Sequence, residues 1–284
     1  MSKIAIITDS TAYIPKEYLE QYHITIVPQV LIWGDQTYED GFTIQPDEFY
    51  QRLSTAKVMP TTAQVSVINM RTAFTGLLEE GYHVFGIFLS AKLSGTLQSA
   101  IQARAAFING KEKIEIIDSN TTAMAMGFQV LAAARAARDG ASVNDCKQLI
   151  EIARESTGVY FVVDTLEFLH RGGRIGGAQR FLGTALNIKP ILALQDGKVE
   201  ALERVRTKSK AVDRLIEILA RQTAGKTPVR LASLHANAPV EARDLLDRAA
   251  KLINPVEAIF TSVSPVVGSH TGPGTLGLAY MTGL

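Results

Sequence analysis

The stretch "HVFGIFLSAKLSGTLQSA", residues 83–100, decides the fold of this chain. Its first seven residues form an apolar run that predicts a buried strand. Hydroxyl side chains and a glycine follow from Ser90 to Ala100, and such residues are favoured where helices begin. A buried strand that passes at once into a helix is typical of α/β proteins with a mainly parallel sheet.

Strands and helices alternate through the first half of the chain. Three apolar runs predict strands, and each is followed by polar side chains. The expected strands are residues 3–8, 83–89 and 113–118, and the expected helices are residues 66–80, 94–107 and 121–140, the last with Gly140 as its C-cap. The alternation predicts an N-terminal α/β domain, residues 1–157, with helices flanking a mainly parallel sheet.

The pattern changes after residue 157, where hairpin signals join the helices. The dipeptide Asp196-Gly197 between two apolar runs is suited to a tight hairpin turn. A second domain, residues 158–284, is therefore expected to be α+β with a mixed or antiparallel sheet. Its expected elements are strand 158–164, two glycine-broken helices in 165–187, hairpin 189–205, helix 208–222, strand 229–236, helix 239–252 and strand 256–263.

Composition excludes several classes of protein. The 284 residues carry 29 basic and 28 acidic side chains, so no basic surplus indicates nucleic-acid binding. Cys146, the one cysteine, lies in a helical pattern and is expected to be a structural thiol. The apolar run before Asp9 is too short for a signal peptide, and no stretch reaches the ~20 apolar residues of a membrane span. We expect a cytoplasmic protein.

Nucleotide and metal motifs are weak in this sequence. "GPGTLG", residues 272–277, has the G-x-G-x-x-G spacing, but no acidic residue follows it and no P-loop is present. The histidines are scattered, without the spacing of metal ligands. We therefore expect neither a metal nor a cofactor. His270 differs from the other histidines because it lies in "VGSHTGPG", which indicates a polar, glycine-rich loop.

Hydroxyl side chains gather in three separate stretches: "DST" at residues 9–11, "PTTAQVS" at 60–66 and "LSGT" at 93–96. The last two can be explained by helix capping, with Thr62 or Ser66 for one helix and Ser94 or Thr96 for another. Capping is compatible with ligand binding, because free amides at a helix N-terminus attract anions. Three such stretches predict a shared anion pocket.

Glycines and basic residues gather in "LHRGGRIGGAQR", residues 169–180. Glycine inside a helix costs roughly 1 kcal/mol relative to alanine, so four of them indicate a sharp turn or a close backbone approach. Arg171 and Arg174 flank these glycines, and "VRTKSKA", residues 205–211, adds Arg206. The basic residues are explained either by a solvated face or by a dock for an anionic partner or phosphate.

Taken in order, these stretches resemble the DegV family of fatty-acid-binding proteins. The resemblance runs over almost the whole chain and is carried by "ITDSTAYIP", "PTTAQVS", "LSAKLSGTLQSA", "IIDS", "LEFLHRGGRIGG", "NIKPIL", "VRTKSKA" and "SHTGPGTLG". It implies two α/β domains with a long-chain fatty acid between them. It also implies that some members present the acid to a separate ATP-dependent fatty-acid kinase, which makes the acyl phosphate.

The resemblance also assigns residues. It places the fatty-acid carboxylate on Thr62 and on Ser94 with the adjacent Gly95, and it places His270 close by. Arg174, and with it Arg171 and Arg206, match basic residues expected to dock the partner or support the phosphoryl step. Family members often read T-S-Q-P-S where this chain has Thr-Ala-Gln-Val-Ser at residues 62–66, so Thr61 could share the role of Thr62.

Transfer energies agree with a lipid ligand. Each buried methylene is worth about 0.8 kcal/mol, so the tail provides most of the affinity while hydroxyls and amides orient the head. The low aromatic content, 7%, predicts a tunnel lined by aliphatic side chains and methionine. Met124, Met126 and Phe128 either line it or belong to the ordinary core. Lipid exchange could also bring transient contact with a membrane surface.

An enzymatic alternative stays open. Ser94 could act as a nucleophile with His270 as its base, in a hydrolase or acyl transferase, and Asp9 or Asp118 would orient the histidine. The sequence lacks the G-x-S-x-G nucleophile elbow of many hydrolases, which weighs against this alternative.

Overall fold

A parallel sheet organises the first half of the chain. The computed structural model describes residues 3–183 and 188–284. Four strands pair in parallel, which confirms the mainly parallel sheet expected from the alternating pattern. Their order across the sheet is β2 (Thr25–Val27), β1 (Ile4–Asp9), β6 (His83–Phe88) and β7 (Ile114–Asp118).

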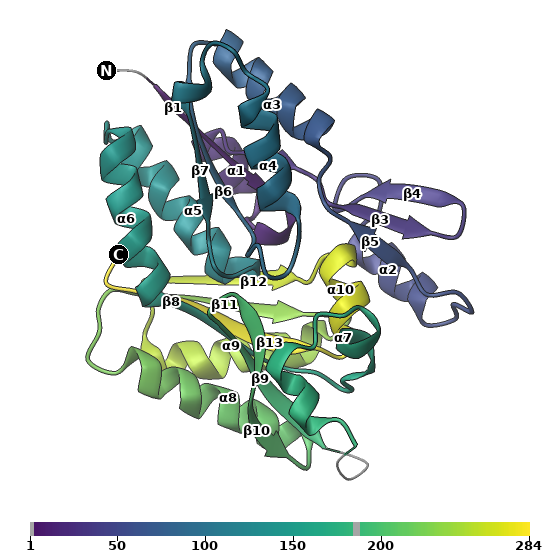
Figure 1. Cartoon of the computed structure of the whole chain (residues 1–284). Coiled ribbons are helices and arrows are strands. Elements are labelled where there is room, and N and C mark those ends of the chain that lie inside the picture. Colours follow the sequence, from purple (N-terminus) through teal and green to yellow (C-terminus); the bar gives the residue numbers. More distant parts are fainter. Residues whose placement is uncertain (1–2, 184–187) are drawn as a thin grey trace.

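A mixed sheet of six strands organises the second half, as expected (Figure 1). Only β11 and β12 pair in parallel, and the other neighbours are antiparallel. The strand order is β10 (Lys198–Val205), β9 (Lys189–Gln195), β8 (Thr157–Val162), β13 (Leu276–Thr282), β11 (Val229–His235) and β12 (Glu257–Ser262). The sequence patterns did not predict β13, which lies at the centre of this sheet.

Helices cover both sheets in layers (Figure 1). The parallel sheet has α3 (Val67–Glu79) and α4 (Thr96–Ala105) on one face, and α5 (Ala123–Arg138) packs between the two sheets. The outer face of the mixed sheet carries α8 (Lys208–Thr223) and α9 (Pro239–Ile253). The remaining long helix, α6 (Val143–Ser156), packs on α5, and the short helix α1 (Lys16–Tyr22) contacts α5 as well.

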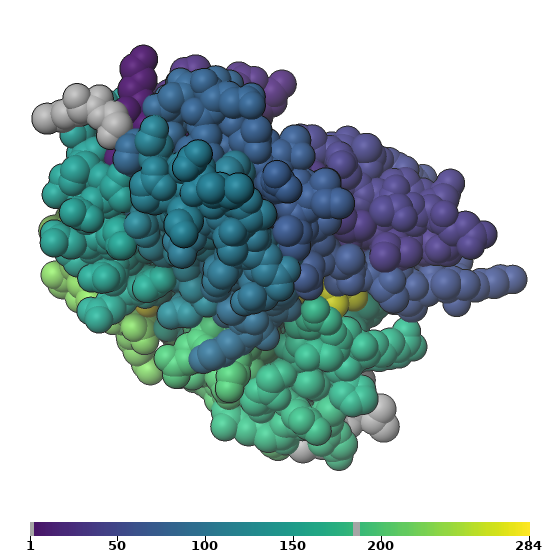
Figure 2. All heavy atoms as spheres, turned by 45° about the horizontal axis from the view of Figure 1, so that its top comes forward, coloured from purple at the N-terminus to yellow at the C-terminus, as the bar shows by residue number. Residues whose placement is uncertain are grey.

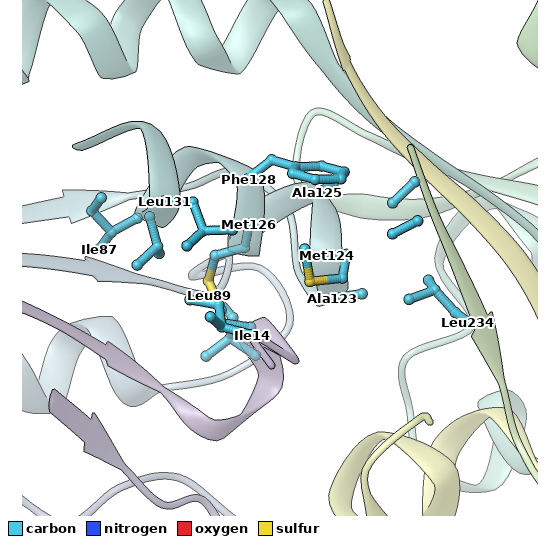
Figure 3. Close-up of a cluster of buried hydrophobic side chains, with 14 of the residues drawn as sticks. Ile14, Ile87, Leu89, Ala123, Met124, Ala125, Met126, Phe128, Leu131 and Leu234 are labelled. Carbon is cyan, nitrogen blue, oxygen red and sulfur yellow. The ribbon is translucent and has the colours of Figure 1, made fainter. Parts of the chain in front are cut away.

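Helix α5 makes the two halves share one hydrophobic core. A single buried cluster includes Phe85 of the parallel sheet, Leu131 of α5 and Met281 of the mixed sheet. Met124, Met126 and Phe128 are fully buried in this cluster, so they belong to the ordinary core (Figure 3). The boundary expected near residue 157 coincides with the first residue of β8. The division into two domains at this residue stays a prediction, because one hydrophobic core extends across it.

A small third sheet projects to one side of the molecule (Figure 2). It consists of β4 (Gln36–Glu39), β3 (Val30–Trp33) and β5 (Thr61–Ala63), accompanied by α2 (Pro46–Leu53). The hydroxyl-rich stretch at residues 60–66 contains a strand that the sequence patterns did not predict, since β5 pairs with β3. β3 (VLIW) is apolar throughout, and β4 (QTYE) and β5 (TTA) are mostly polar, so none of these three short strands alternates apolar with polar residues.

Capping explains some of the hydroxyl side chains and not others. Ser66 caps α3 by accepting a hydrogen bond from Asn69 N at 3.0 Å, as one of the capping alternatives predicted. Helix α4 begins instead after Gly95, without a side-chain cap. Neither Ser94 nor Thr96 is the N-cap residue, although Ser94 Oγ accepts a hydrogen bond from Thr96 N, the first residue of the helix. The Thr96 hydroxyl is engaged by other parts of the chain, described below.

The glycine-rich segment folds as two short helices, as expected. They are α7 (Glu167–Arg171) and a 3₁₀ helix, η3 (Gly176–Phe181). The end of the expected range, residues 184–187, lies outside the described residues. Cys146 is buried in α6 and the Asp196-Gly197 turn joins β9 to β10, which confirms both predictions. Among the helices of residues 3–183 and 188–284, none combines the length and apolar character that crossing a bilayer requires.

Candidate functional site

A cavity of about 370 Å³ lies between the two sheets. It opens at the carboxyl ends of β1 and β6, where parallel sheets bind their ligands. Its walls are mainly aliphatic, as expected, although no methionine is among the described lining residues. The apolar lining consists of Ala63, Leu89, Leu93, Ala123, Val159, Phe161, Leu169, Leu194, Val199, Leu234, Val263, Val266 and Val267.

The polar residues named from the sequence meet in this cavity. Thr62, Ser94, Gly95 and His270 all line it, although they come from β5, from the turn before α4 and from the C-terminal part of the chain. Thr62 Oγ1 and His270 Nε2 lie 2.8 Å apart, across 208 residues of sequence. The prediction of a shared pocket is therefore supported by one direct hydrogen bond.

His270 lies on a short helix and not in a loop as expected. The helix, α10 (Pro265–Thr271), begins with a proline at its first turn and ends at Gly272, whose φ is +77°. Burial and the nearby Arg174 charge lower the pKa of His270 to about 4, so the ring is neutral at neutral pH. Its Nδ1 is buried without a hydrogen-bond partner in the described part of the chain.

Gly172, which has no side chain, leaves room for the His270 imidazole. The backbone of this residue lies so close to His270 Nδ1 that a Cβ atom there would collide with the ring. This close approach explains one of the glycines in "LHRGGRIGG", as the sequence analysis anticipated. The segment between α7 and η3 thus forms one wall of the site.

Arg174 brings a positive charge to the cavity. Its Nε donates to Leu93 O at 3.0 Å and its Nη1 donates to Gly172 O at 2.7 Å. Within residues 3–183 and 188–284, no carboxylate forms an ion pair with it. Carbonyl groups orient the guanidinium without neutralising it, so the cavity favours an anionic ligand.

Ser94 is tied to the other hydroxyl-rich stretches through Thr96. Ser94 Oγ lies 3.1 Å from Thr96 Oγ1 and accepts a hydrogen bond from Thr96 N at 3.3 Å. Thr96 Oγ1 also accepts hydrogen bonds from Gln29 Nε2 at 2.8 Å and from Val65 N at 3.3 Å. The turn before α4 is thereby joined to the segment that follows β5.

A buried carboxylate, Asp40, connects this network to the helix of His270. Its Oδ1 accepts from Val266 N of α10 at 2.9 Å, and its Oδ2 accepts from Ser10 Oγ at 2.7 Å. Ser10 Oγ in turn accepts from Gln29 N at 3.1 Å. Burial raises the pKa of Asp40 to about 6. Sequence reasoning missed Asp40 and Gln29, because their partners are distant in sequence and no local pattern marks them.

Three residues named from the sequence lie outside the cavity. Thr61 is exposed on β5, on the side of the strand opposite to Thr62. Arg171 is exposed and pairs with Glu167 at 2.5 Å. Arg206 is exposed in the bend after β10. These residues therefore do not contribute to the polar cluster around His270.

The geometry does not form the catalytic triad of the enzymatic alternative. In the described residues, no hydrogen bond joins Ser94 to His270, and no carboxylate reaches His270 Nδ1. The carboxylate of Asp9 accepts from the Thr11 amide and hydroxyl and from Leu89 N. Asp118 accepts from Asn120 N and Ala91 N. Both acids that were considered are thus occupied elsewhere.

Metal-ligating side chains do not gather in the described ranges. No group of three or more histidine, cysteine, aspartate or glutamate side chains there is placed to hold an ion. The chemistry available in the cavity is therefore that of hydroxyls, amides, one neutral imidazole and one guanidinium.

Known proteins are similar to this chain over nearly its full length. A family model described as an uncharacterised protein of the DegV family matches residues 3–283. A DegV domain-containing protein of Streptomyces coelicolor is 40% identical over 97% of both chains. The protein DegV of Bacillus subtilis is 34% identical over 98% of both chains.

Solved structures show the same fold. A DegV family protein from Thermus thermophilus, described by its fatty-acid binding, superposes with a TM-score of 0.93 at 34% identity over 99% of both chains. DegV from Bacillus subtilis, described as a fatty-acid-binding protein, gives a TM-score of 0.90 at 33% identity over the whole of both chains. A stearic-acid-binding protein from Eubacterium ventriosum gives 0.90 at 25% identity over 99% of this chain and 98% of its own.

The low pKa of His270 predicts a titration that can be followed directly. In unligated protein, the His270 ring should stay neutral as the pH falls through 6.5, and it should titrate at about 4. Because the unfolded chain binds this proton more readily, His270 makes stability fall as the pH drops from 6.5 towards 4. NMR of the ring protons, assigned with His270→Gln, measures the midpoint. A midpoint near 6.5 would contradict the buried placement.

Gly172→Ala should displace the imidazole. The helical backbone at Gly172, with φ of −73°, tolerates alanine, so the effect arises from the collision with His270 and not from backbone strain. We expect the His270 resonances to shift and its pKa to rise towards the ordinary value as the ring moves outward. Gly76→Ala on α3 is the control, since a Cβ there meets open space and adds up to about 1 kcal/mol of stability. Unchanged His270 resonances in Gly172→Ala would refute the contact.

Proposed function

This chain belongs to the DegV family, and from that premise we propose that it is a carrier that binds one long-chain fatty acid. The cavity between the sheets takes the tail, and the Thr62–Ser94–His270 cluster takes the carboxylate. The observation that carries the proposal is the Arg174 charge, unpaired among the described residues, in an otherwise aliphatic cavity. Relatives of similar length described as fatty-acid-binding proteins support it.

The hydroxyl groups can donate to a carboxylate. With the proton on Nε2, the neutral His270 ring donates to Thr62 Oγ1 and leaves the Thr62 hydroxyl hydrogen free for the ligand. Ser94 and the Gly95 backbone amide lie on the same cavity wall and add further donors. Each hydrogen bond to a charged group contributes about 1.5–3 kcal/mol.

The aliphatic walls supply the larger part of the affinity. A sixteen-carbon tail gains on the order of 10 kcal/mol when its methylenes leave water. Without a charge partner, a buried carboxylate would become protonated instead of staying ionised. Arg174 and the hydroxyls therefore determine the orientation and charge state of the head group, and the tail determines how tightly the acid is held.

The carrier would act with a partner. We propose that it presents the acid to a separate ATP-dependent fatty-acid kinase in the cytoplasm, and that the exposed Arg171 and Arg206 contact this partner or support the phosphoryl step. Two domains, residues 1–157 and 158–284, would enclose the ligand between them. Transient contact with a membrane surface would allow lipid exchange.

Ligand retention tests the proposal. Mass spectrometry of natively purified and then denatured protein should release a long-chain fatty acid, and labelled palmitate or oleate should bind after delipidation. Loss of one charge-assisted hydrogen bond in Ser94→Ala or Thr62→Ala should weaken binding about tenfold or more without unfolding. Thr61→Ala is the matched control, since Thr61 neighbours Thr62 in β5 but is exposed and outside the cavity.

Two results would count against the carrier. A protein that is free of lipid after purification and takes up neither labelled acid does not have this function. If Ser94→Ala and Thr62→Ala both bind as tightly as Thr61→Ala, the carboxylate assignment is wrong even though the acid is bound. Ester turnover that Ser94→Ala abolishes would instead establish the enzymatic alternative.

A further inference from the structure

Gly277 is the last glycine of "GPGTLG", the stretch at residues 272–277 that fatty-acid binding leaves unexplained. It lies in β13, at the centre of the mixed sheet, and it lines the cavity. Its neighbours on the adjacent strands are Phe161 of β8 on one side and Leu234 of β11 on the other. Both neighbours line the cavity as well. The three residues therefore form one row of the cavity floor.

The backbone alone does not require glycine at position 277. Gly272 and Gly274 of the same stretch have φ of +77° and +78°, values that favour glycine. Gly277 instead has the extended backbone of a strand, and β13 keeps continuous register with β8 from Leu276 to Met281. Glycine inside a regular strand lowers its stability and often marks a place where a ligand or another part of the chain comes close. The reason for glycine therefore lies in what surrounds it.

A side chain at position 277 would face the cavity. Successive residues of a strand point to opposite faces of the sheet. Leu276 and Leu278 pack in the hydrophobic cluster of α8 and α9, on the outer face, whereas Ala279 packs in the cluster that contains α5. Position 277 therefore faces inward, on the same side of the sheet as α5.

Gly277 leaves a notch in this row of the floor. A Cβ atom there would lie 3.1 Å from Phe161 Cβ and 3.4 Å from Leu234 Cδ1, and it would also lie 3.1 Å from Tyr160 O. The contact with Phe161 is shorter than the ~3.5 Å at which carbon atoms pack. An alanine at this position would therefore fill the notch and press on Phe161, which itself lines the cavity.

The walls beside the notch belong to the packed core. Leu234 points from β11 towards Ala123, at the start of α5 (Figure 3). Both residues line the cavity, both are buried, and both belong to the single cluster that the two sheets share. Close-packed interiors respond to a volume change of even one methylene, so a ligand gains little space by moving these walls.

We propose that Gly277 sets the length of the acyl chain that the cavity accepts, an inference that rests on the proposed fatty-acid binding. A tail that fills the cavity uses the space of the notch, whereas a shorter tail leaves free space and can move aside. Gly277 has no side chain to offer the polar cluster of Thr62, Ser94 and His270. Its influence therefore depends on the length of the tail and not on the head group.

Equilibrium binding of labelled laurate, myristate, palmitate and stearate to the delipidated full chain tests this inference. Each methylene that is kept out of an apolar cavity lowers the affinity about fourfold. Gly277→Ala should therefore weaken palmitate binding about tenfold or more, while laurate binding changes less than about threefold, because only the longer tail loses its space. Phe161→Leu, which enlarges the cavity beside the notch, should raise the affinity for stearate relative to palmitate about twofold or more.

Gly86→Ala is the matched control. It also adds a methyl group to a buried strand glycine, where the Cβ atom would meet the Phe88 ring, but Gly86 lies in β6 and outside the cavity. Its thermal stability measures the cost of crowding alone, and its ratio of palmitate to laurate affinity should equal that of wild type. Phe161→Leu keeps the test decisive if Gly277→Ala does not fold.

Two kinds of result would overturn the inference. An equal loss for all four acids in Gly277→Ala, or unchanged affinity ratios in both cavity variants, would show that Gly277 does not select chain length and would leave fatty-acid binding itself standing. Wild-type protein that binds none of the four acids would refute the proposed function, and this inference with it.

Discussion

The buried carboxylate of Asp40 is the interaction on which the site depends. It accepts one hydrogen bond from α10, the helix of His270, and another from Ser10, which is bonded to Gln29. Gln29 extends the connection to Thr96 beside Ser94. Burying a carboxylate is costly unless its oxygens are paired, and here both are. Asp40 thereby holds in one place side chains that the chain itself separates by more than a hundred residues.

The hydrogen bonds of Asp40 hold polar side chains in position within a cavity whose walls are otherwise mainly aliphatic. Hydroxyls and a neutral imidazole add little charge of their own, so among the described residues that line the cavity the formal charge is that of Arg174. The walls around the Arg174 guanidinium are mainly apolar, and in such surroundings of low polarity a charge attracts an anion more strongly than it would in water. In the proposed function, recognition is divided between the polar cluster, which binds the head group, and the apolar walls, which bind the tail.

Features that depend on neighbouring residues were predicted from the sequence more often than contacts between residues far apart in the chain. Local signals predicted three of the four parallel strands and the Asp196-Gly197 turn correctly, because each depends on neighbouring residues. The patterns missed β13, whose strand is buried on both faces and lies next to a glycine-rich stretch, and they placed His270 in a loop. Asp40 could not be found, since its partner in α10 is 226 residues away.

The charge state of the bound head group directly tests whether Arg174 and the hydroxyl donors hold an ionised carboxylate. For protein loaded with palmitate labelled with carbon-13 at its carboxyl, we expect one carboxyl resonance whose shift stays constant from about pH 8 to about pH 5. In the proposed site, Arg174 and the hydroxyl donors would hold the pKa of the acid low, and Arg174→Gln should raise it. A carboxyl resonance that titrates above about pH 6, or that does not respond to Arg174→Gln, would show that Arg174 does not hold the carboxylate.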